Sequence, residues 1–483
     1  MTTPTPTVGR VSPQGVTRQD TTAEPATDVG LREANPTYGA EVVLLEELAA
    51  PIKNSIVGGP FGSNLVSKDY VSCGVPVIRG QNMGGRWVGG EFVFVSAEKA
   101  DSLSPNKAHP GDLVFTQRGT LGQVAIVPMS PYSEYIVSQS QMKVTLDATK
   151  ADVNFLYYAF RSPEQLDYIK NTAIQTGVPH TNLGILKKTP IQLPPLADQR
   201  QIAALLGLLD DRITLLRETN ATLEAIAQAL FKSWFVDFDP VRARQQGLAP
   251  EGMIDATAAL FPDGFEESEL GLVPKGWKVM PVGGVVEGIY DGPHATPPEA
   301  NDGPVFLGIK NLTGSTLDLS DIRHIAESDF AQWTRRVTPR AGDIVFSYEA
   351  TLGFFALIPE NLRCCLGRRL ALIRPRTSGG HGHFWFHQFV APPFQRLLEK
   401  HTIHGATVNR IALKEFPHYQ VLNPPAGIKA AFDGFVAPLW QRIQANHAQA
   451  QTLATLRDTL LPRLISGQLR LPEAQAELES ARP

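Results

Sequence analysis

The sequence has few cysteines and no long apolar stretch, and both shortages exclude classes of protein. Only three of the 483 residues are cysteine, and Cys364 and Cys365 are adjacent, so no disulfide framework is expected. No apolar run of about 18 residues occurs that would span a membrane. The first 30 residues are rich in threonine, proline and glycine and lack the apolar core of a signal peptide. We therefore expect a reducing, cytoplasmic location, no membrane partner, and a disordered tail over residues 1–36.

The sequence also lacks the motifs of common catalytic and cofactor sites. No glycine-rich loop follows a predicted strand and opens a helix, and there is no Walker A sequence, so no nucleotide or S-adenosylmethionine site is recognisable. Residues 423–426, NPPA, are similar to the Asn-Pro-Pro-aromatic motif of amino-methyltransferases, but Ala426 has no ring to stack on a base. We interpret this segment as a strand-to-helix junction, and Asp237 and Asp239 as capping residues at a helix exit. No catalytic residue is expected.

Histidines are the strongest metal-ligand candidates. His381, His383 and His387 lie two and six residues apart and could chelate a metal from one face. However, the surrounding segment HGHFWFH is typical of a core helix with aromatic side chains, and the first half of the chain has no equivalent. The adjacent cysteines lack a second cysteine pair. We therefore predict no metal site.

The charge distribution favours a selective DNA-binding role over a general one. The chain carries 44 Lys and Arg and 48 Asp and Glu, a net charge of −4. Residues 60–195 hold twelve basic and ten acidic side chains, and residues 276–424 hold fifteen and thirteen. In contrast, residues 237–275 hold three basic and eight acidic side chains. Two slightly positive segments joined by an acidic connector suit a protein whose partners supply most of the phosphate contacts.

A phrase of the sequence occurs twice, 231 residues apart. GDLVFTQRGTLGQVAIVP occupies residues 111–128, and GDIVFSYEATLGFFALIP occupies residues 342–359. The similarity extends further: VPVIRGQNM matches PVFLGIKNL, GGPFGSN matches DGPHATP, TGVPHTNLGILKK matches HGATVNRIALKE, and QLPPLADQRQI matches VLNPPAGIKAAF. The offset stays between about 228 and 233. The whole chain is therefore an internal duplication.

Each half is predicted to combine short strands with a few helices, so the fold class is α+β. Runs such as GVPVIRG, DLVFTQ, DIVFSY and LALIRP are rich in β-branched and aromatic residues and are bounded by glycine, proline and asparagine. Each half then ends in a long helical pattern with one narrow apolar stripe, which is typical of a coiled-coil seam. The first stripe contains Ile202, Leu205, Leu209, Ile213, Leu216, Asn220, Leu223, Ala227, Leu230 and Trp234. The second contains Phe432, Phe435, Leu439, Ile443, Asn446, Ala450, Leu453, Arg457, Leu460 and Leu464.

Two matching stripes in one chain favour pairing of the two helices with each other. If they pair, the connector requires them to run antiparallel, with Asn220 and Asn446 as buried polar residues that fix the register. About 35 helical residues would then form a rod of roughly 50 Å, with a β-rich unit at each end. In the alternative, each helix packs only on its own β-rich unit.

Two diverged units on a rigid spacer suit a target with two separated parts. A 50 Å rod corresponds to roughly fifteen base pairs of B-DNA. The units differ at polar positions: Gln117-Arg118-Gly119 becomes Tyr348-Glu349-Ala350, and we match residues 139–141, QSQ, with residues 367–369, GRR. Variable polar loops on a shared scaffold are typical of recognition surfaces.

The sequence resembles the specificity subunits of type I restriction-modification systems. The resemblance covers residues 40 to 468 and rests on the repeated GDLVFTQRGTLG and GDIVFSYEATLG phrases, the VIRGQNM strand, LPPLADQRQIAALLGLLDDRI, SELGLVPKGW, and the final PLW and RLISGQL. The sequence differs from the family pattern at two places. Lys429 stands at the position that corresponds to Gln199, and the KGW segment that precedes the second β-rich unit has no equivalent before the first. These departures affect the domain edges.

The resemblance implies an organisation, a role and partners. Each β-rich unit would be a target-recognition domain that reads half of a split, asymmetric double-stranded DNA sequence, without catalysis of its own. The helices would form the antiparallel spacer and would dock methyltransferase (modification) subunits, expected to number two, which restriction subunits join. S-adenosylmethionine and ATP would bind to those partners, and the complex would direct methylation and restriction against phage DNA. The expected segments are a tail at 1–36, a first recognition domain at 37–195, a spacer helix at 196–236, a connector at 237–275, a second recognition domain at 276–424, a spacer helix at 425–466, and a tail at 467–483.

Polar loop residues are the candidates for DNA contact, because Arg and Lys suit guanine edges and Asn and Gln suit adenine. In the first unit they are Arg79, Gln81, Asn82, Arg86, Gln117, Arg118, Gln139, Gln141, His180, Thr181 and Asn182. In the second unit they are His294, Lys310, Asn311, Tyr348, Arg368, Arg369, Thr407, Asn409 and Arg410. About half are expected to touch DNA, mostly at phosphates. Asn82 and Asn311 match across the units, so a shared turn is the alternative for them.

Two other functions stay open at this point. A fused methyltransferase or nuclease would need the cofactor loop that the sequence lacks. A protein–protein adaptor would use the two β-rich units to hold peptides or proteins, and its binding would not depend steeply on salt.

Overall fold

The computed structural model describes residues 39–480, except 176–178, 377–381 and 406–407. The chain divides into two compact units, one of residues up to Ile202 together with those from Pro462, and one of Ala203–Leu461. Within the described ranges, no helix has the length and apolarity needed to cross a bilayer. The two β-rich halves of the internal repeat fall in different units.

The first domain contains two small sheets built from short Val- and Ile-rich strands. One is antiparallel, in the order β2 (Ile56–Gly58), β10 (Gln141–Val144), β7 (Leu113–Thr116) and β8 (Val124–Ile126). The other has the order β3 (Tyr70–Val71), β5 (Val93–Val95), β4 (Val75–Ile78), β9 (Tyr135–Val137) and β6 (Lys107–Ala108), with β4 and β9 parallel. β1 (Glu41–Leu44) pairs with β11 (Pro190–Leu193). The helices are α1 (Ala97–Ser102), α2 (Val153–Ala159), α3 (Pro163–Thr172) and α4 (Leu183–Lys187).

The second domain repeats this topology. Its antiparallel sheet has the order β15 (Val286–Asp291), β23 (Leu370–Pro375), β20 (Ile344–Ser347) and β21 (Phe355–Leu357). A further sheet joins β19 (Arg323–His324), β16 (Ala300–Leu307) and β22 (Cys364–Leu366), and its β16–β22 pair is parallel as β4–β9 is. β14 (Lys278–Pro281) pairs with β26 (Gln420–Asn423), as β1 pairs with β11. The helices are α8 (Val282–Val285), α9 (Phe330–Trp333), α10 (His383–Val390) and α11 (Pro392–Lys400).

A buried carboxylate lies at the same position in both domains. Asp112 accepts the His109 backbone N–H at 2.8 Å and lies 3.3 Å from the Lys143 ammonium. Asp343 accepts the Arg340 backbone N–H at 2.9 Å and two hydrogen bonds from the Arg374 guanidinium at 2.8 and 2.6 Å. The neighbouring Asp343 raises the pKa of Arg374. Pairing offsets the cost of burying each charge, and it explains why Gly-Asp begins both copies of the repeated phrase.

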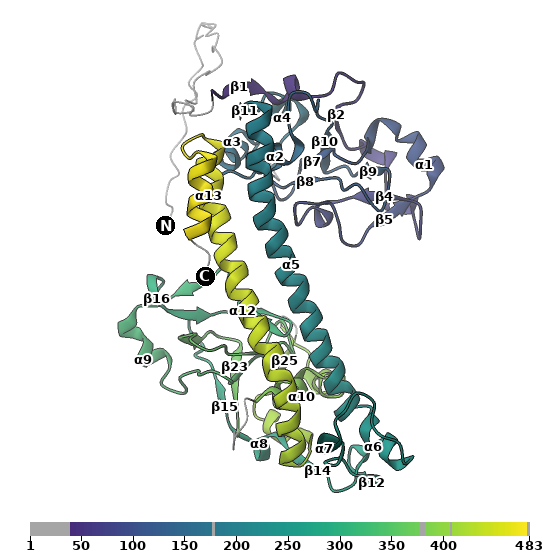
Figure 1. The fold of residues 1–483 in the computed structure, drawn as a ribbon, viewed down its shortest axis with the longest axis vertical. Helices are drawn as coiled ribbons and strands as arrows, with labels where there is room; N and C mark the ends of the chain where they lie inside the picture. Colours follow the sequence, from purple (N-terminus) through teal and green to yellow (C-terminus); the bar gives the residue numbers. More distant parts are fainter. Residues whose placement is uncertain (1–38, 176–178, 377–381, 406–407, 481–483) are drawn as a thin grey trace, which may run out of the picture. The chain divides into compact units, whose positions relative to one another are not determined.

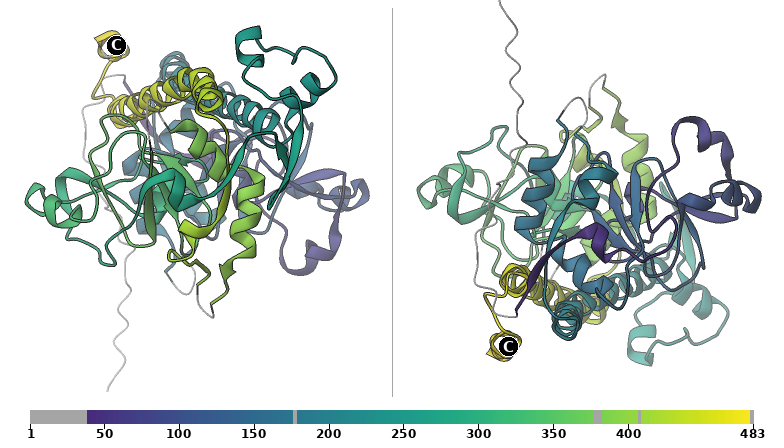
Figure 2. Two further views of the ribbon diagram at one scale, coloured as in Figure 1. Left: turned by 90° about the horizontal axis from the view of Figure 1, so that it is seen from below. Right: turned by 90° about the horizontal axis from the view of Figure 1, so that it is seen from above.

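Two long helices pair antiparallel, as the sequence predicts. α5 (Leu196–Phe235) and α12 (Ala426–Ile465) each contain 40 residues and lie side by side in Figures 1 and 2. The guanidinium of Arg457 donates to Asp210 at 2.6 Å, and the rings of Trp234 and Phe435 lie 5.7 Å apart, so the C-terminal part of one helix meets the N-terminal part of the other. This arrangement confirms the predicted fold class of α+β domains with two long paired helices.

The middle of the seam contains a polar contact between the two helices. The Asn446 amide donates to the Asn220 side-chain oxygen at 2.8 Å, and the Asn220 amide donates to the Ile443 carbonyl at 3.1 Å. Both asparagines are buried. Beside them, Ile213, Leu216 and Ala450 form an apolar cluster against Leu453 and Ala454. A slip of one residue would leave both amides without partners, so this pair favours a single register.

The burial of the stripe departs from the regular ladder near its ends. The predicted stripe contains Leu205, but Leu205 is half-buried and its neighbour Leu206 is buried instead. Phe435 is 45 % exposed, although it contacts Trp234, and Val436 and Trp440 are buried instead. The reason is a third element, because Trp440 packs on Phe386 of α10. The alternative in which each helix packs only on its own domain is wrong, although α12 does contact α10. Of the remaining seam residues, Ile202, Leu209, Ile443, Leu460 and Leu464 are buried, and Leu223, Leu230, Leu439 and Leu453 are half-buried.

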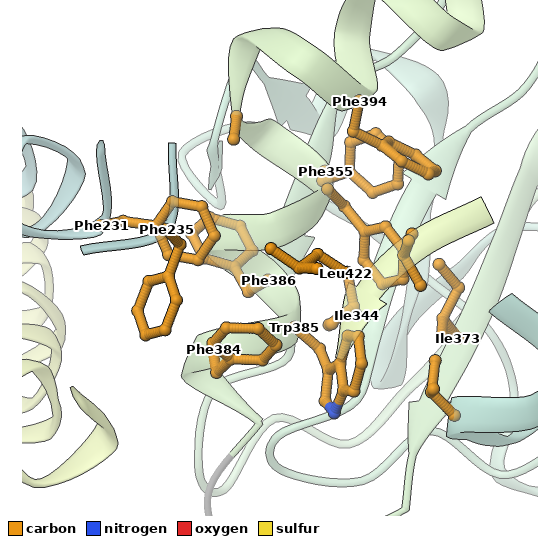
Figure 3. Packing of buried hydrophobic residues seen from close by; sticks show 14 of the residues in the cluster. Phe231, Phe235, Ile344, Phe355, Ile373, Phe384, Trp385, Phe386, Phe394 and Leu422 are labelled. Atoms are coloured by element: carbon orange, nitrogen blue, oxygen red, sulfur yellow. The ribbon is translucent and has the colours of Figure 1, made fainter. Parts of the chain in front are cut away.

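An aromatic core joins the end of α5 to the second domain. The ring of Phe235 lies 4.9 Å from that of Phe384, and the ring of Phe231 lies 5.7 Å from the same side chain (Figure 3). The connector adds Val241 and Phe261 to this core. It folds as α6 (Asp239–Gln245), α7 (Asp255–Ala258) and the hairpin of β12 (Phe265–Ser268) and β13 (Gly271–Pro274).

The C-terminal segment that the sequence assigned to a tail contains helix α13 (Leu471–Ser480). Arg463 pairs with Glu477 through two hydrogen bonds of 2.9 Å, and Leu469, Leu471 and Ala474 are buried. A ten-residue helix with buried apolar side chains and a bidentate ion pair is part of the folded structure.

Two of the three histidines considered as metal ligands, His383 and His387, belong to the core of the second domain. His387 is buried, and its Nε2 accepts the Trp440 indole N–H at 3.1 Å. His383 stacks on Trp440 with the ring centroids 6.2 Å apart, and His381 lies outside the described residues. Over the part of the chain that the structure describes, no group of three or more His, Cys, Asp and Glu side chains is placed to hold a metal ion.

Burial of His387 predicts a loss of stability in mild acid. Burial, and to a lesser degree the nearby His383, lower the pKa of His387 from 6.5 to about 3. Below pH 6.5 His387 of the unfolded chain takes up a proton that the folded chain excludes. The free energy of unfolding therefore keeps its full value above that pH and decreases below it. We expect a loss of about 2 kcal/mol between pH 7 and pH 5 from this residue. Chemical unfolding at both pH values should show this loss in the wild type and not in His387→Gln, whose amide can still accept from Trp440. An equal loss in both proteins would contradict it.

Candidate nucleic-acid interface

Four loops of the first domain come together at one end of the β2-β10-β7-β8 sheet. We call this the first loop cluster, and its segments are residues 58–65, 117–123, 138–141 and 179–182. The Gln117 N–H donates to the Ser140 carbonyl at 2.7 Å, and the Thr181 N–H donates to the Gln117 carbonyl at 3.0 Å. Arg118 and His180 form a β-bridge. The Gly59 N–H donates to the Gln141 carbonyl at 2.8 Å.

The second domain builds the same cluster from residues 291–297, 348–353, 367–370 and 408–411, which we call the second loop cluster. The Tyr348 N–H donates to the Arg369 carbonyl at 3.2 Å, and the Ile411 N–H donates to the Tyr348 carbonyl at 2.8 Å. Glu349 and Arg410 form the matching β-bridge. The Gly292 N–H donates to the Leu370 carbonyl at 3.0 Å. Each of these four backbone contacts of one cluster therefore has a counterpart in the other.

These contacts correct the sequence matching of two loops. Ser140 and Arg369 make equivalent contacts, so Gln139 corresponds to Arg368. The sequence comparison instead places Gln139 opposite Gly367, one residue earlier. Sheet register agrees, because Gln141 pairs with Thr116 where Leu370 pairs with Ser347. His180 likewise corresponds to Arg410. The backbone hydrogen bonds establish which residues correspond. The corresponding residues differ in type, so the sequence alone does not identify them.

The structure gathers seven of the eleven candidates of the first domain into the first loop cluster. Arg118 and Gln139 are exposed, Gln117, His180 and Asn182 are half-buried, and Gln141 and Thr181 are buried. Asn182 caps α4 by accepting the Ile185 N–H at 2.9 Å. The other four candidates lie outside the cluster. Of these, Arg86 donates to Asn154 at 2.8 Å and stacks over Trp87, and Gln81 donates to the Glu91 carbonyl at 3.2 Å. Arg79 precedes the 3-10 turn at Gly80–Asn82.

The second loop cluster contains His294, Tyr348, Arg368, Arg369, Asn409 and Arg410. His294, Arg368, Asn409 and Arg410 are exposed, Arg369 is half-buried, and Tyr348 is buried. Thr407 lies outside the described residues. Lys310 lies outside the cluster and pairs with Asp321 at 2.5 Å.

Asn82 and Asn311 hold a turn that the two domains share. Asn82 accepts the Arg79 N–H at 3.1 Å and donates to the carbonyls of Gly89 and Glu91 at 3.0 and 2.9 Å. Asn311 accepts the Gly308 N–H at 2.9 Å and donates to two carbonyls at 3.0 Å. Both are buried. The amide groups of both side chains are hydrogen-bonded within their own domain. Asn82 and Asn311 therefore hold a shared turn, which was the alternative to DNA contact for these two residues.

Charge is arranged differently in the two clusters. Asp291 of the second cluster accepts the Tyr348 hydroxyl at 2.8 Å, and it lies 2.7 Å from His294 and 3.5 Å from Arg336. Burial and this carboxylate raise the pKa of Tyr348, so the phenol stays protonated and donates. Glu349 lies 3.8 Å from Arg369. The first cluster has Gln117 at the position of Tyr348 and Arg118 at the position of Glu349. The two surfaces therefore present different hydrogen-bond donors and acceptors on the same backbone arrangement.

One prominent residue of the first cluster was missed by ranking polar side chains. Phe61 is 80 % exposed in the loop of residues 58–65. Its position in GGPFGSN matches that of His294 in DGPHATP, which is among the candidates. Comparison of the two repeats at this position, rather than polarity alone, would have identified it.

Comparisons with known proteins agree with this architecture. Residues 68–225 match the type I restriction modification DNA specificity domain. The chain is 24 % identical over 436 residues to the type I restriction enzyme MjaIX specificity subunit of Methanocaldococcus jannaschii, covering 86 % of this chain and 92 % of that one. It is also 24 % identical over 403 residues to the HindI specificity subunit of Haemophilus influenzae, covering 74 % and 86 %.

A solved structure has the same fold at low sequence identity. The S subunit of a type I restriction-modification system from M. genitalium superposes with a TM-score of 0.52 at 14 % identity, covering 90 % of this chain and 98 % of that one. The domain match, the relatives that align over most of both chains, and the duplicated fold with paired long helices all agree. The chain is therefore similar, over most of its length, to the specificity subunits of type I restriction-modification systems.

Proposed function

We propose that each loop cluster reads one half of a split, asymmetric DNA sequence, and that the chain directs methylation and restriction by its partner subunits without catalysing either. The observation that carries this proposal is the pair of loop clusters, which share their backbone contacts and differ in the side chains that they expose. A common scaffold with different donors and acceptors suits two different short sequences. Tyr348 supports the second loop cluster from inside, and the exposed Arg118, Gln139, Arg368, Asn409 and Arg410 face the DNA.

We further propose that modification subunits dock on the paired helices and that restriction subunits join this assembly. An apolar stripe on α5 supports the docking: Leu208, Leu215 and Ile226 are 66 %, 51 % and 50 % exposed. Separations of 7 and 11 residues place these three side chains on one face of a helix. Isolated exposed apolar residues are ordinary, but a stripe of them on one helix marks an interaction surface. S-adenosylmethionine and ATP are then bound by the partners.

The proposed DNA binding is tested by titrating the assembled specificity and modification subunits into a labelled duplex that carries the target, and following fluorescence anisotropy. We expect affinity to fall about 10³- to 10⁵-fold between 50 and 200 mM salt if six to ten phosphates are contacted. Replacing either half of the target should weaken binding toward the non-specific level. An adaptor would instead bind target and scrambled duplexes alike, with little dependence on salt, and this result would refute the proposal.

A further inference from the structure

Phe61 is a large apolar side chain presented to solvent by a loop that is firmly held. Among the large apolar side chains that the structure describes, only Met129 equals its exposed fraction of 80 %. A phenylalanine ring that stays in water lacks the stabilisation that burial of its apolar surface would provide. Single exposed apolar residues are common on protein surfaces, so the location of Phe61 within the first loop cluster is what requires an explanation.

The loop that carries Phe61 is fixed on both sides of the residue. The Gln139 amide donates to the carbonyls of Gly62 and Leu65 at 2.5 and 2.9 Å. On the other side, the Asn106 amide donates to the Gly58 carbonyl at 2.7 Å. A Cβ at Gly59 would collide with the Ser138 carbonyl oxygen, so only glycine allows this close approach. The loop is therefore ordered by the loop that carries Gln139, and the position of Phe61 is set in advance of binding.

The second loop cluster has a different ring at this position. Gly59 and Gly292 make the same backbone hydrogen bond, and each is followed by a proline and then by the ring-bearing residue. In the second cluster that residue is His294, whose Nε2 lies 2.7 Å from the Asp291 carboxylate. The first domain thus has an apolar ring where the second has a polar ring held by a carboxylate. An exposed polar residue is unremarkable in solution, whereas an exposed phenylalanine gains by finding an apolar surface.

We propose that Phe61 stacks on, or inserts between, bases of the first half of the DNA target. The inference rests on the proposed function, because it takes the first loop cluster as the surface that meets DNA. Base faces are the apolar surfaces that a duplex offers, and phenylalanine wedges unstack base steps in other DNA-binding proteins. The exposed polar side chains of the same cluster, Arg118 and Gln139, suit the surrounding phosphates and base edges. His294 makes a polar contact at the corresponding point of the second half.

The test compares Phe61→Ala, Phe61→Trp and the matched control Met129→Ala in the assembled complex with modification subunits. Met129 is equally exposed but lies outside the loop cluster. We expect Phe61→Ala to weaken binding of the target duplex about 5- to 100-fold with an unchanged salt slope, because the ring neutralises no phosphate. Phe61→Trp should keep most of the affinity, and Met129→Ala should have no effect.

A 2-aminopurine placed at successive positions of the first half locates the contact. Its fluorescence should rise at one base step with the wild-type complex and should not rise with Phe61→Ala. Unchanged affinity of Phe61→Ala, or a loss accompanied by a lower salt slope or by no 2-aminopurine response in the wild type, would overturn the inference. Failure of the wild-type complex to distinguish target from scrambled DNA would refute the proposed function instead, so the two failures are separable.

Discussion

We expect that exchanging residues 40–195 for the same segment of a specificity subunit with a different target will change one half of the methylated sequence and leave the other half intact. The exchange replaces the first loop cluster as a whole, with the backbone contacts that hold it, and leaves the second cluster in place. Specific DNA binding is typically 10³- to 10⁷-fold tighter than non-specific binding. The hybrid should therefore lose the original target by a factor in this range and gain a hybrid target.

The junction of this exchange needs one contact to be preserved. Gln199 at the start of α5 accepts the Asp152 N–H at 2.9 Å and donates to the carbonyls of Lys150 and Pro194 at 3.2 and 2.8 Å. All three partners are backbone atoms, so a related domain with the same turn can supply them. The converse exchange of residues 276–424 is the matched control, and it should alter only the other half. Methylation of an unchanged sequence by the first hybrid would contradict the assignment of the two clusters to two half-sites.

The sequence predicts the parts of this fold that depend on local pattern. The apolar spacing of α5 and α12 and the two seam asparagines follow from helical periodicity, and the side chains of Asn220 and Asn446 are hydrogen-bonded in the structure. The internal repeat predicts the common topology of the two domains. Gly-Asp at the start of the repeated phrase marks a buried carboxylate in both, although the sequence alone does not reveal its partners, Lys143 and Arg374.

Features that depend on a third element are not predictable in this way. Trp440 and Val436 are buried in place of Leu439 and Phe435 because α10 packs on α12, and periodicity along one helix carries no information about that contact. Loop correspondence is set by backbone hydrogen bonds, so Gln139 and Arg368 were matched one residue out of step. Phe61 was missed because apolar residues are expected inside a domain, and only the loop around it shows that it is held outside.

The largest effect is expected from removing the gene in cells that carry the complete system. If this chain alone selects the target, methylation at every target site should disappear, because modification subunits without it lack both loop clusters. The target itself should consist of two short specified sequences of different composition, separated by an unspecified spacer of one length. We expect a constant spacer if the paired helices act as the rigid rod that the sequence predicts; α5 itself is one helix of 40 residues.

The measurement that tests this most directly is a genome-wide map of methylated bases with and without the gene, followed by restoration with the wild-type chain. The account predicts a split sequence of constant spacing that is methylated only when the chain is present. Methylation that persists after deletion, or a single continuous target sequence, would contradict it.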